Sequence, residues 1–158
     1  MILLLWAAVC FALLVVDWCC WAPNRLDADM ASEQLLANLL AQEGGVMSTN
    51  WYYSTELRVL NTQLVMAPLF RLFTSWHTVR VVGSVVLILL YLAAWFWFGR
   101  SAKLKYCGLL GAGLLVLPYG ALYRQYVLEG LYYIPHIAIS FVVLGCAVRI
   151  LRGGRGLA

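Results

Sequence analysis

Charged residues are scarce in this chain of 158 residues, because Asp, Glu, Lys and Arg together make up 11% of it. A soluble domain has roughly a quarter of its residues charged, so this scarcity excludes a water-soluble globule. Aromatic residues reach 14% and apolar residues 64%, which excludes a disordered chain as well. The composition is that of an integral membrane protein.

Histidines are also few, and the sequence has only His77 and His136. They form no HxxxH or HExxH arrangement, so we predict no dedicated histidine-based metal site. His136 directly follows Pro135, where it would either bind a ligand, shuttle protons or make an interfacial hydrogen bond. The sequence has no phosphate-binding glycine loop and no Ser-His-Asp pattern. Beyond its net charge of +4 nothing suggests nucleic acid, and no nucleic-acid partner is predicted.

The five cysteines lack the spacing of a zinc or redox site, since no CxxC pair occurs. Three of them lie in long apolar runs, where a thiol behaves as a small hydrophobic group. We therefore expect neither a disulfide framework nor a cysteine-based function. The five are Cys10, Cys19, Cys20, Cys107 and Cys146.

Four apolar runs are long enough to cross a bilayer as helices, which takes roughly 20 residues each. Arg80 lies at the mouth of the second run, and the third run contains no charge. The sequence therefore predicts an all-α polytopic membrane protein, a single membrane domain with about four transmembrane helices and one long external loop. The predicted spans are residues 2–21, 79–98, 106–123 and 131–148, and the loop covers residues 22–78.

The first run could be a cleaved signal peptide, but its sequence favours an uncleaved anchor. A signal peptide begins with a basic segment and ends at a small-residue cleavage site. Here Met1 leads directly into apolar residues, and the run ends in Asp17, Trp18 and two cysteines. Asp17 is expected to be hydrated or hydrogen-bonded to Trp18, although an ionisable group at membrane depth is also a candidate functional residue.

Positive and negative charges are distributed asymmetrically around the predicted spans. The stretches that follow the second and fourth spans carry basic residues and no acid, and the acidic residues lie on the other side or at its interface. Short cytoplasmic loops collect Lys and Arg, so we expect a plasma (inner) membrane protein with both termini in the cytoplasm. The basic residues are Arg100, Lys103, Lys105, Arg149, Arg152 and Arg155.

The external loop is expected to contain two helices that lie at the outer membrane surface. Four leucines recur with helical spacing in its first half, where Asp29 or Ser32 would cap the start and Gly44 would end the helix. Residues 51–73 show a second helical pattern, which Pro68 would break. The four leucines are Leu35, Leu36, Leu39 and Leu40.

This order of features resembles the opening of the GT-C superfamily of membrane glycosyltransferases. An acidic residue follows the first span, then a surface helix, then glycine, as in the segment DMASEQLLANLLAQEG that begins at Asp29. The segment WYYSTEL over residues 51–57 is similar to segments of multispanning bacterial proteins of this kind. The resemblance covers mainly residues 1–98.

The resemblance implies sugar transfer from a polyprenyl-phosphate carrier to an acceptor at the outer face of the membrane. The chain departs from the family in two respects. The family usually shows two adjacent acids, whereas Met30 follows Asp29, so Asp27 would have to supply the second carboxylate. The family also has more spans than four, so the chain is expected to be the N-terminal part of such an enzyme or a shortened relative.

Sugar transfer needs a base for the acceptor hydroxyl and a cation for the departing phosphate. Arginine suits the phosphate because its guanidinium binds two oxygens at once. A divalent metal is neither required nor excluded by the sequence. Asp29 is the best candidate for the base, with Asp27 and Glu56 next, and the candidates for phosphate binding are Arg58, Arg80 and Arg124.

Each of these residues also has a structural interpretation. Asp29 would serve as a plain helix cap, and Glu56 would pair with Arg58 or with a lipid headgroup. Arg80 and Arg124 would extend towards headgroups. The alternative function is that of a small non-enzymatic integral membrane protein, which binds a lipid carrier or acts as an assembly or transporter partner. In both interpretations the partners are the lipid bilayer and, for an incomplete bundle, further membrane helices or subunits.

Overall fold

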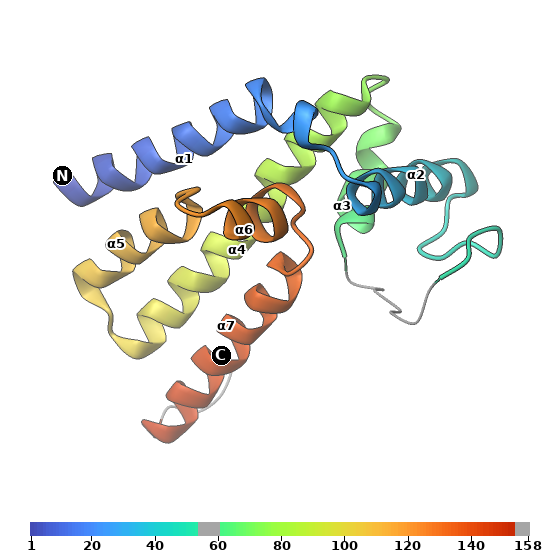
Figure 1. The fold of residues 1–158 in the computed structure, drawn as a ribbon. Helices are drawn as coiled ribbons and strands as arrows, with labels where there is room; N and C mark the ends of the chain where they lie inside the picture. The colour runs from blue at the N-terminus through green and yellow to red at the C-terminus, as the bar shows by residue number, and fades with distance from the viewer. Residues whose placement is uncertain (54–60, 154–158) are drawn as a thin grey trace.

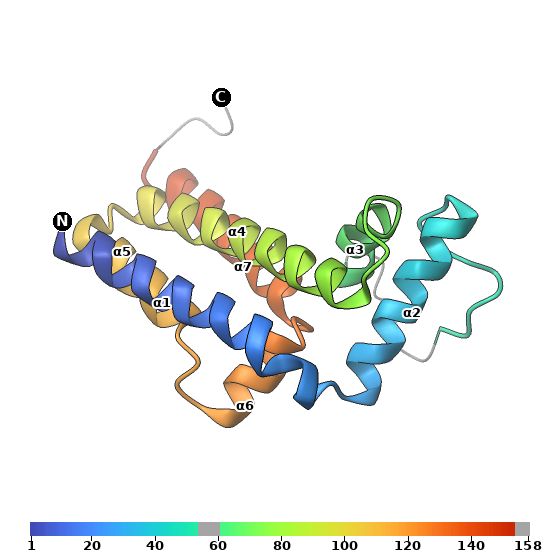
Figure 2. The same cartoon turned by 90° about the horizontal axis from the view of Figure 1, so that it is seen from above.

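The computed structural model describes residues 1–53 and 61–153, and this part of the chain is helical without any strand (Figure 1). The long helices form a bundle, and a separate pair of helices packs at one end of it (Figure 2). The elements are α1 (Ile2–Cys20), η1 (Ala22–Arg25), α2 (Ala28–Glu43), α3 (Thr62–Phe70), α4 (Trp76–Ala102), α5 (Lys105–Val116), α6 (Ala121–Tyr123), η2 (Arg124–Glu129) and α7 (Ile134–Leu151).

Three of these helices, α1, α4 and α7, are long and apolar enough to cross a membrane. A fourth crossing is formed if α5 and the helical segment after it count as one span. The predicted all-α polytopic membrane fold is therefore confirmed. Helix α4 has 27 residues and is about 40 Å long, so it exceeds the roughly 30 Å of a bilayer core and extends beyond the predicted span at both ends.

The third apolar run is not one straight helix over residues 106–123, as the sequence suggested. Helix α5 ends at Val116, and the helical segment that begins at Ala121 is bent from it by 86°. Pro118 explains the break, because proline lacks an N–H and pushes the preceding residue towards an extended conformation. Leu117 has that conformation, with ψ 122°.

The contacts along the bundle show the direction of each helix. Helix α7 lies beside α4 and runs the same way, since Phe141 stacks on Tyr91 and Arg152 bonds to the carbonyl of Ser101. The segment from α5 to η2 runs parallel to α1. Gly113 near the end of α5 faces Trp6 near the start of α1, and the indole nitrogen of Trp18 near the end of α1 donates to the carbonyl of Leu128 in η2. The start of α1 and the end of α7 therefore lie at the same end of the bundle, away from α2 and α3 (Figure 2).

This arrangement means that the bent segment passes from one end of the bundle to the other. It begins just after α4 ends, and it finishes at Glu129, beside the end of α1. A re-entrant loop would return to the end at which it started. The path of the segment is therefore that of a broken span, which would make it the fourth crossing.

Helix α2 begins one turn earlier than the leucine pattern alone requires. Its cap is Asp27, whose Oδ1 accepts a 2.8 Å hydrogen bond from the amide of Met30, so neither Asp29 nor Ser32 has that role. The helix ends at Gly44, whose φ of 79° is left-handed, as predicted. Figure 1 shows α2 beside α3, and the two helices share a small core of Leu36, Leu40 and Ala67.

Helix α3 is shorter than the second helical pattern of the loop. It covers Thr62–Phe70, and the first part of the predicted helix lies largely outside the described residues. Pro68 lies inside the helix, which ends two residues later. A proline this close to the C-terminal end removes one hydrogen bond without breaking the preceding turns.

Candidate functional site

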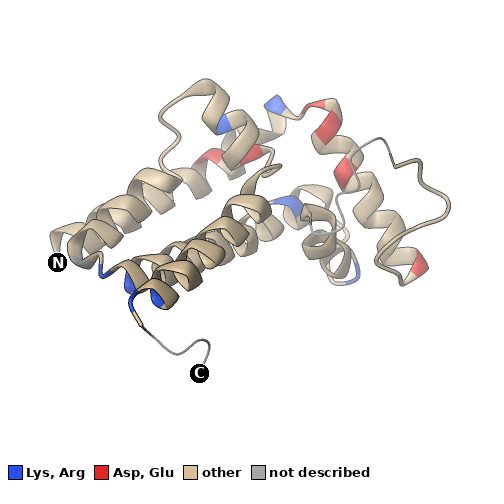
Figure 3. Ribbon diagram, turned by 90° about the horizontal axis from the view of Figure 1, so that it is seen from below, with Lys and Arg blue, Asp and Glu red and all other residues tan. Residues whose placement is uncertain are grey.

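The described acidic residues gather at one end of the bundle and on α2, where arginines accompany them, whereas the described charged residues of the other end are all basic (Figure 3). We call these two ends the acidic end and the basic end. The basic end has the described residues Arg100, Lys103, Arg149 and Arg152. The acidic end includes the neighbouring helix α2, and its described acids are Asp17, Asp27, Asp29, Glu33, Glu43 and Glu129. Glu56 lies outside the described residues.

A buried group of ion pairs lies at the acidic end. Glu129 is only 3% exposed, and its Oε1 lies 2.6 Å from Arg25 Nη2 and 3.3 Å from Arg124 Nε. The same Arg25 nitrogen lies 2.7 Å from Asp17 Oδ1, so the two carboxylates are close together. Burial alone would lower the pKa of Arg25, but its bonds to Asp17 and Glu129 raise that pKa above its ordinary value. Arg25 therefore stays cationic and joins α1 to η2 through η1.

One expectation for this region needs correction. Asp17 was expected to be hydrated or bonded to Trp18, but it is buried against Arg25. The indole nitrogen of Trp18 donates instead to the carbonyl of Leu128, at 3.0 Å. Arg124 pairs with Glu129, and its binding of phosphate stays a prediction.

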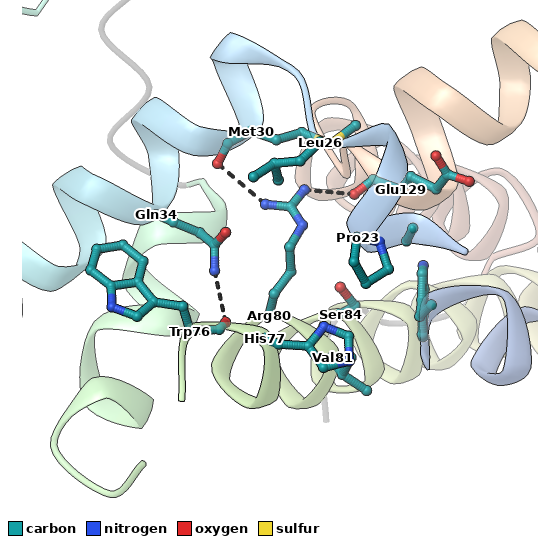
Figure 4. Close-up of a pocket in the computed structure, with 12 residues that line it drawn as sticks. Pro23, Leu26, Met30, Gln34, Trp76, His77, Arg80, Val81, Ser84 and Glu129 are labelled. Carbon is teal, nitrogen blue, oxygen red and sulfur yellow. Dashed lines mark hydrogen bonds between the residues drawn. The ribbon is translucent and has the colours of Figure 1, made fainter. Parts of the chain in front are cut away.

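Arg80 turns into the protein at the acidic end (Figure 4). Its Nη1 donates to the carbonyl of Met30 at 3.3 Å, and its Nη2 donates to the carbonyl of Glu129 at 2.8 Å. These bonds bring α4, the first turn of α2 and the end of η2 together. They differ from the expectation that the side chain extends towards lipid headgroups.

A cavity of about 150 Å³ lies beside Arg80 (Figure 4). Gln34 lines one wall and is fixed by a 3.0 Å hydrogen bond from its Nε2 to the carbonyl of Trp76. Ser84 is buried on the opposite side, and most of the remaining wall is apolar. The lining residues are Trp18, Ala22, Pro23, Leu26, Met30, Gln34, Trp76, His77, Arg80, Val81, Ser84 and Glu129.

Asp27 is held next to this cavity by a second set of hydrogen bonds. Its Oδ1 accepts from the amide of Met30 and, at 2.8 Å, from the hydroxyl of Tyr132. Burial alone would raise the pKa of the Asp27 carboxyl, but these bonds, a bond from Gln125 and the charge of Arg80 hold it below its ordinary value. Asp27 is therefore a carboxylate at neutral pH.

The Tyr132 hydroxyl is surrounded by acidic groups. Its pKa is raised, first by burial and then by Asp27, Glu33 and Asp29. Tyr132 was not among the site residues predicted from the sequence. The structure thus places the Tyr132 hydroxyl on Asp27, and Asp29 follows two residues later in the first turn of α2.

The remaining predicted residues differ in their surroundings. Asp29 is exposed in the first turn of α2 and does not line the cavity, while Glu56 and Arg58 lie outside the described residues. His77 lines the cavity, and His136 is exposed at the start of α7. Within residues 1–53 and 61–153, no three His, Cys, Asp or Glu side chains are grouped as a metal site requires.

Comparisons with protein-family models, with curated proteins and with solved structures give no match to this chain. The fold and the charged ends define its class, an all-α polytopic membrane protein with an internally paired acidic end. Any closer assignment depends on the site itself.

Proposed function

We propose that this chain is the membrane portion of a glycosyltransferase similar to the GT-C superfamily, which takes sugar from a polyprenyl-phosphate carrier. The observation that supports the proposal is a cavity walled by Arg80, with Asp27 bonded to the amide of the lining residue Met30 and Asp29 exposed in the same first turn of α2. Acidic groups for the acceptor and a cation for the phosphate then lie at one end of the bundle.

In this proposal Asp29 is the base and Arg80 holds the phosphate. The acceptor oxygen attacks the anomeric carbon of the sugar, Asp29 takes the acceptor proton, and the carrier phosphate leaves with the electron pair. Arg80 uses two of its five N–H groups on backbone carbonyls, so the others can donate to phosphate oxygens. Asp27 has a lowered pKa and is a poor proton acceptor, so it acts by its charge.

The proposal also places the acidic end at the outer face of the plasma membrane. Its support is the set of basic residues at the opposite end, which the positive-inside rule assigns to the cytoplasm. The carrier headgroup and the acidic end would then lie at the same depth. Further membrane helices or subunits would complete the site.

The test uses membranes that contain the full chain, with a radiolabelled polyprenyl-phosphate hexose as the donor. We expect labelled product from the wild type, and a loss of about a hundredfold or more in Asp29→Asn, because a positioned base contributes that much. Glu43→Gln is the matched control, since Glu43 is an exposed acid at the far end of α2. Unchanged transfer in Asp29→Asn would show that Asp29 is not the base. Absence of transfer by the wild type would show that a polyprenyl-phosphate hexose is not the donor.

A second function, that of a non-enzymatic membrane partner, is favoured by the internal use of the acidic side chains. Glu33 accepts hydrogen bonds from Asn61 and Thr62 of the next helix, and Asp17 and Glu129 are paired with Arg25. These acids hold helices together. Absence of transfer by the wild type, together with cross-linking in native membranes to an integral membrane subunit at equal stoichiometry, would support this function.

A further inference from the structure

Two hollows lie next to each other along the line of contact between α4 and α7, which we call the seam. One is at the basic end, and the other extends from it towards the acidic end. The first is about 200 Å³ and is lined by Trp97, Arg100, Ser101 and Arg149. The second is about 470 Å³ and apolar, and Trp97 lines it as well. The other residues of this apolar hollow are Leu90, Ala93, Ala94, Ala138, Ile139, Val142 and Val143.

The basic hollow has an uncompensated positive charge. The sequence has no acidic residue between Glu56 and Glu129 or after Glu129, so α4, α5 and α7 bring no carboxylate to it. The guanidinium carbon of Arg149 lies 4.6 Å from the centroid of the Trp97 ring, which fixes its position. Arg152 adds a further charge nearby, because its Nη1 donates to the carbonyl of Ser101 at 2.8 Å.

The apolar hollow continues from Trp97 along the seam, away from the basic residues. Its small side chains, Ala93, Ala94 and Ala138, leave room between the two helices. Its upper part reaches Leu90, about two turns before Trp97, or roughly 10 Å along α4. A positively charged hollow therefore adjoins an open apolar hollow on one face of the bundle, with Trp97 lining both.

We propose that this seam is a binding site for an anionic phospholipid. The phosphate lies between Arg100 and Arg149, and an acyl chain lies in the apolar hollow beyond Trp97. Arginine binds phosphate oxygens in pairs, and basic pockets between membrane helices bind acidic lipid headgroups. The site is independent of the proposed function, because it uses none of the residues of the acidic end.

A free phosphate ion would satisfy the arginines equally well, but it would leave the apolar hollow unused. The position of Trp97 at the junction of the two hollows favours a ligand with both a charged head and a hydrocarbon chain. Indole rings prefer this depth in membranes, where an apolar ring meets polar headgroups.

The headgroup part is tested by native mass spectrometry of the purified full chain in detergent, with equal amounts of phosphatidylglycerol and phosphatidylcholine. We expect phosphatidylglycerol to be retained preferentially, by about fivefold for each arginine that contacts the phosphate. The variant Arg100→Gln/Arg149→Gln should lose this preference. Arg71→Gln is the control, because Arg71 is an exposed arginine just after α3, far from the seam.

The acyl-chain part is tested by Ala93→Phe, which fills the apolar hollow from an exposed position of α4. We expect fewer retained phosphatidylglycerol molecules in this variant, and no displacement of the lipid by millimolar inorganic phosphate. Circular dichroism should show unchanged helix content in each variant. Equal retention of the two lipids by the wild type, or full displacement by inorganic phosphate with no effect of Ala93→Phe, would overturn the proposal.

Discussion

The acidic and basic ends of this bundle are held together in different ways. At the acidic end opposite charges meet, and the buried Glu129 contacts the partly exposed Arg25 and Arg124. At the basic end all the charges have the same sign, and the arginines contact an aromatic ring or backbone carbonyls. The first end therefore satisfies its charges internally, whereas the second leaves them available to solvent or to phosphate.

The difference shows what each kind of contact can stabilise. A buried carboxylate is tolerated only when it is paired, so the acidic end depends on a few specific residues. Exposed arginines need no partner, so the basic end should tolerate substitution. Within residues 1–53 and 61–153, each end also has one non-glycine residue with positive φ, and these are Leu131, which is buried, and Lys103, which is exposed.

Glu129→Gln should have the largest effect, because it leaves Arg124 without its partner and Arg25 with only Asp17. Breaking a buried pair costs 3–5 kcal/mol, and the partial exposure of both arginines favours about 3 kcal/mol here. Thermal unfolding of the detergent-solubilised protein, followed by circular dichroism, measures the loss. Arg149→Gln, at the other end, should lower the unfolding midpoint far less; equal losses would remove the contrast between the ends.

Glycine substitutions at the two positive-φ positions should act in opposite directions. Lys103 ends α4 with φ 58°, and its backbone would be relieved by glycine, which should stabilise the protein by up to about 1 kcal/mol. Leu131 has φ 61° but is fully buried, so Leu131→Gly should destabilise by about 2 kcal/mol, because lost burial outweighs relief. Chemical denaturation of both variants checks the signs, and a stabilised Leu131→Gly would contradict the packing described for the acidic end.

Two glycines of α5 test whether close packing extends from the acidic end down the bundle. A Cβ at Gly113 would meet the indole of Trp6 on α1, whereas a Cβ at Gly108 would meet nothing within 4 Å. Gly113→Ala should therefore destabilise by about 1–2 kcal/mol, and Gly108→Ala should be neutral or stabilise slightly. Unfolding midpoints of the two variants give the comparison, and a neutral Gly113→Ala would show that α1 and α5 pack loosely.

Acid should weaken the acidic end through Asp27. Its pKa is lower in the folded protein than the ordinary 3.8, so its contribution is fully present above 3.8 and is lost as the pH falls through the folded value. The stability difference between the wild type and Asp27→Asn should therefore shrink between about pH 6 and about pH 3. Unfolding midpoints of both proteins at both pH values measure this difference. A difference that becomes larger at acidic pH would contradict a lowered pKa of Asp27 in the folded protein.

Sequence patterns predicted the helical membrane fold because apolar runs report length and composition directly. The end of α2 at Gly44 was also predictable, since helices commonly end at a glycine in the left-handed conformation. The break at Leu117 was not predicted from the sequence. Residues 106–123 form an uncharged apolar run around Pro118, and hydropathy does not report whether such a run is one straight helix or two bent ones.

The candidate site was only partly predictable. Arg80 and Asp27 were candidates by residue type and position, and the structure places Arg80 at a cavity and Asp27 beside it. The pair of Arg25 with Glu129 was missed, because the two residues are 104 positions apart and local spacing gives no partner over that distance. A lone acid in the short segment between the third and fourth apolar runs was the one available signal for Glu129.

The parallel alignment of α4 and α7 has a consequence for biogenesis. The stacked rings of Tyr91 and Phe141 belong to segments that are separated by the whole of α5, α6 and η2. The α4 surface must therefore wait in the lipid while the kinked segment is synthesised and threaded back through the bilayer. We therefore expect the α4 surface that packs against α7 to contact hydrocarbon chains until α7 docks.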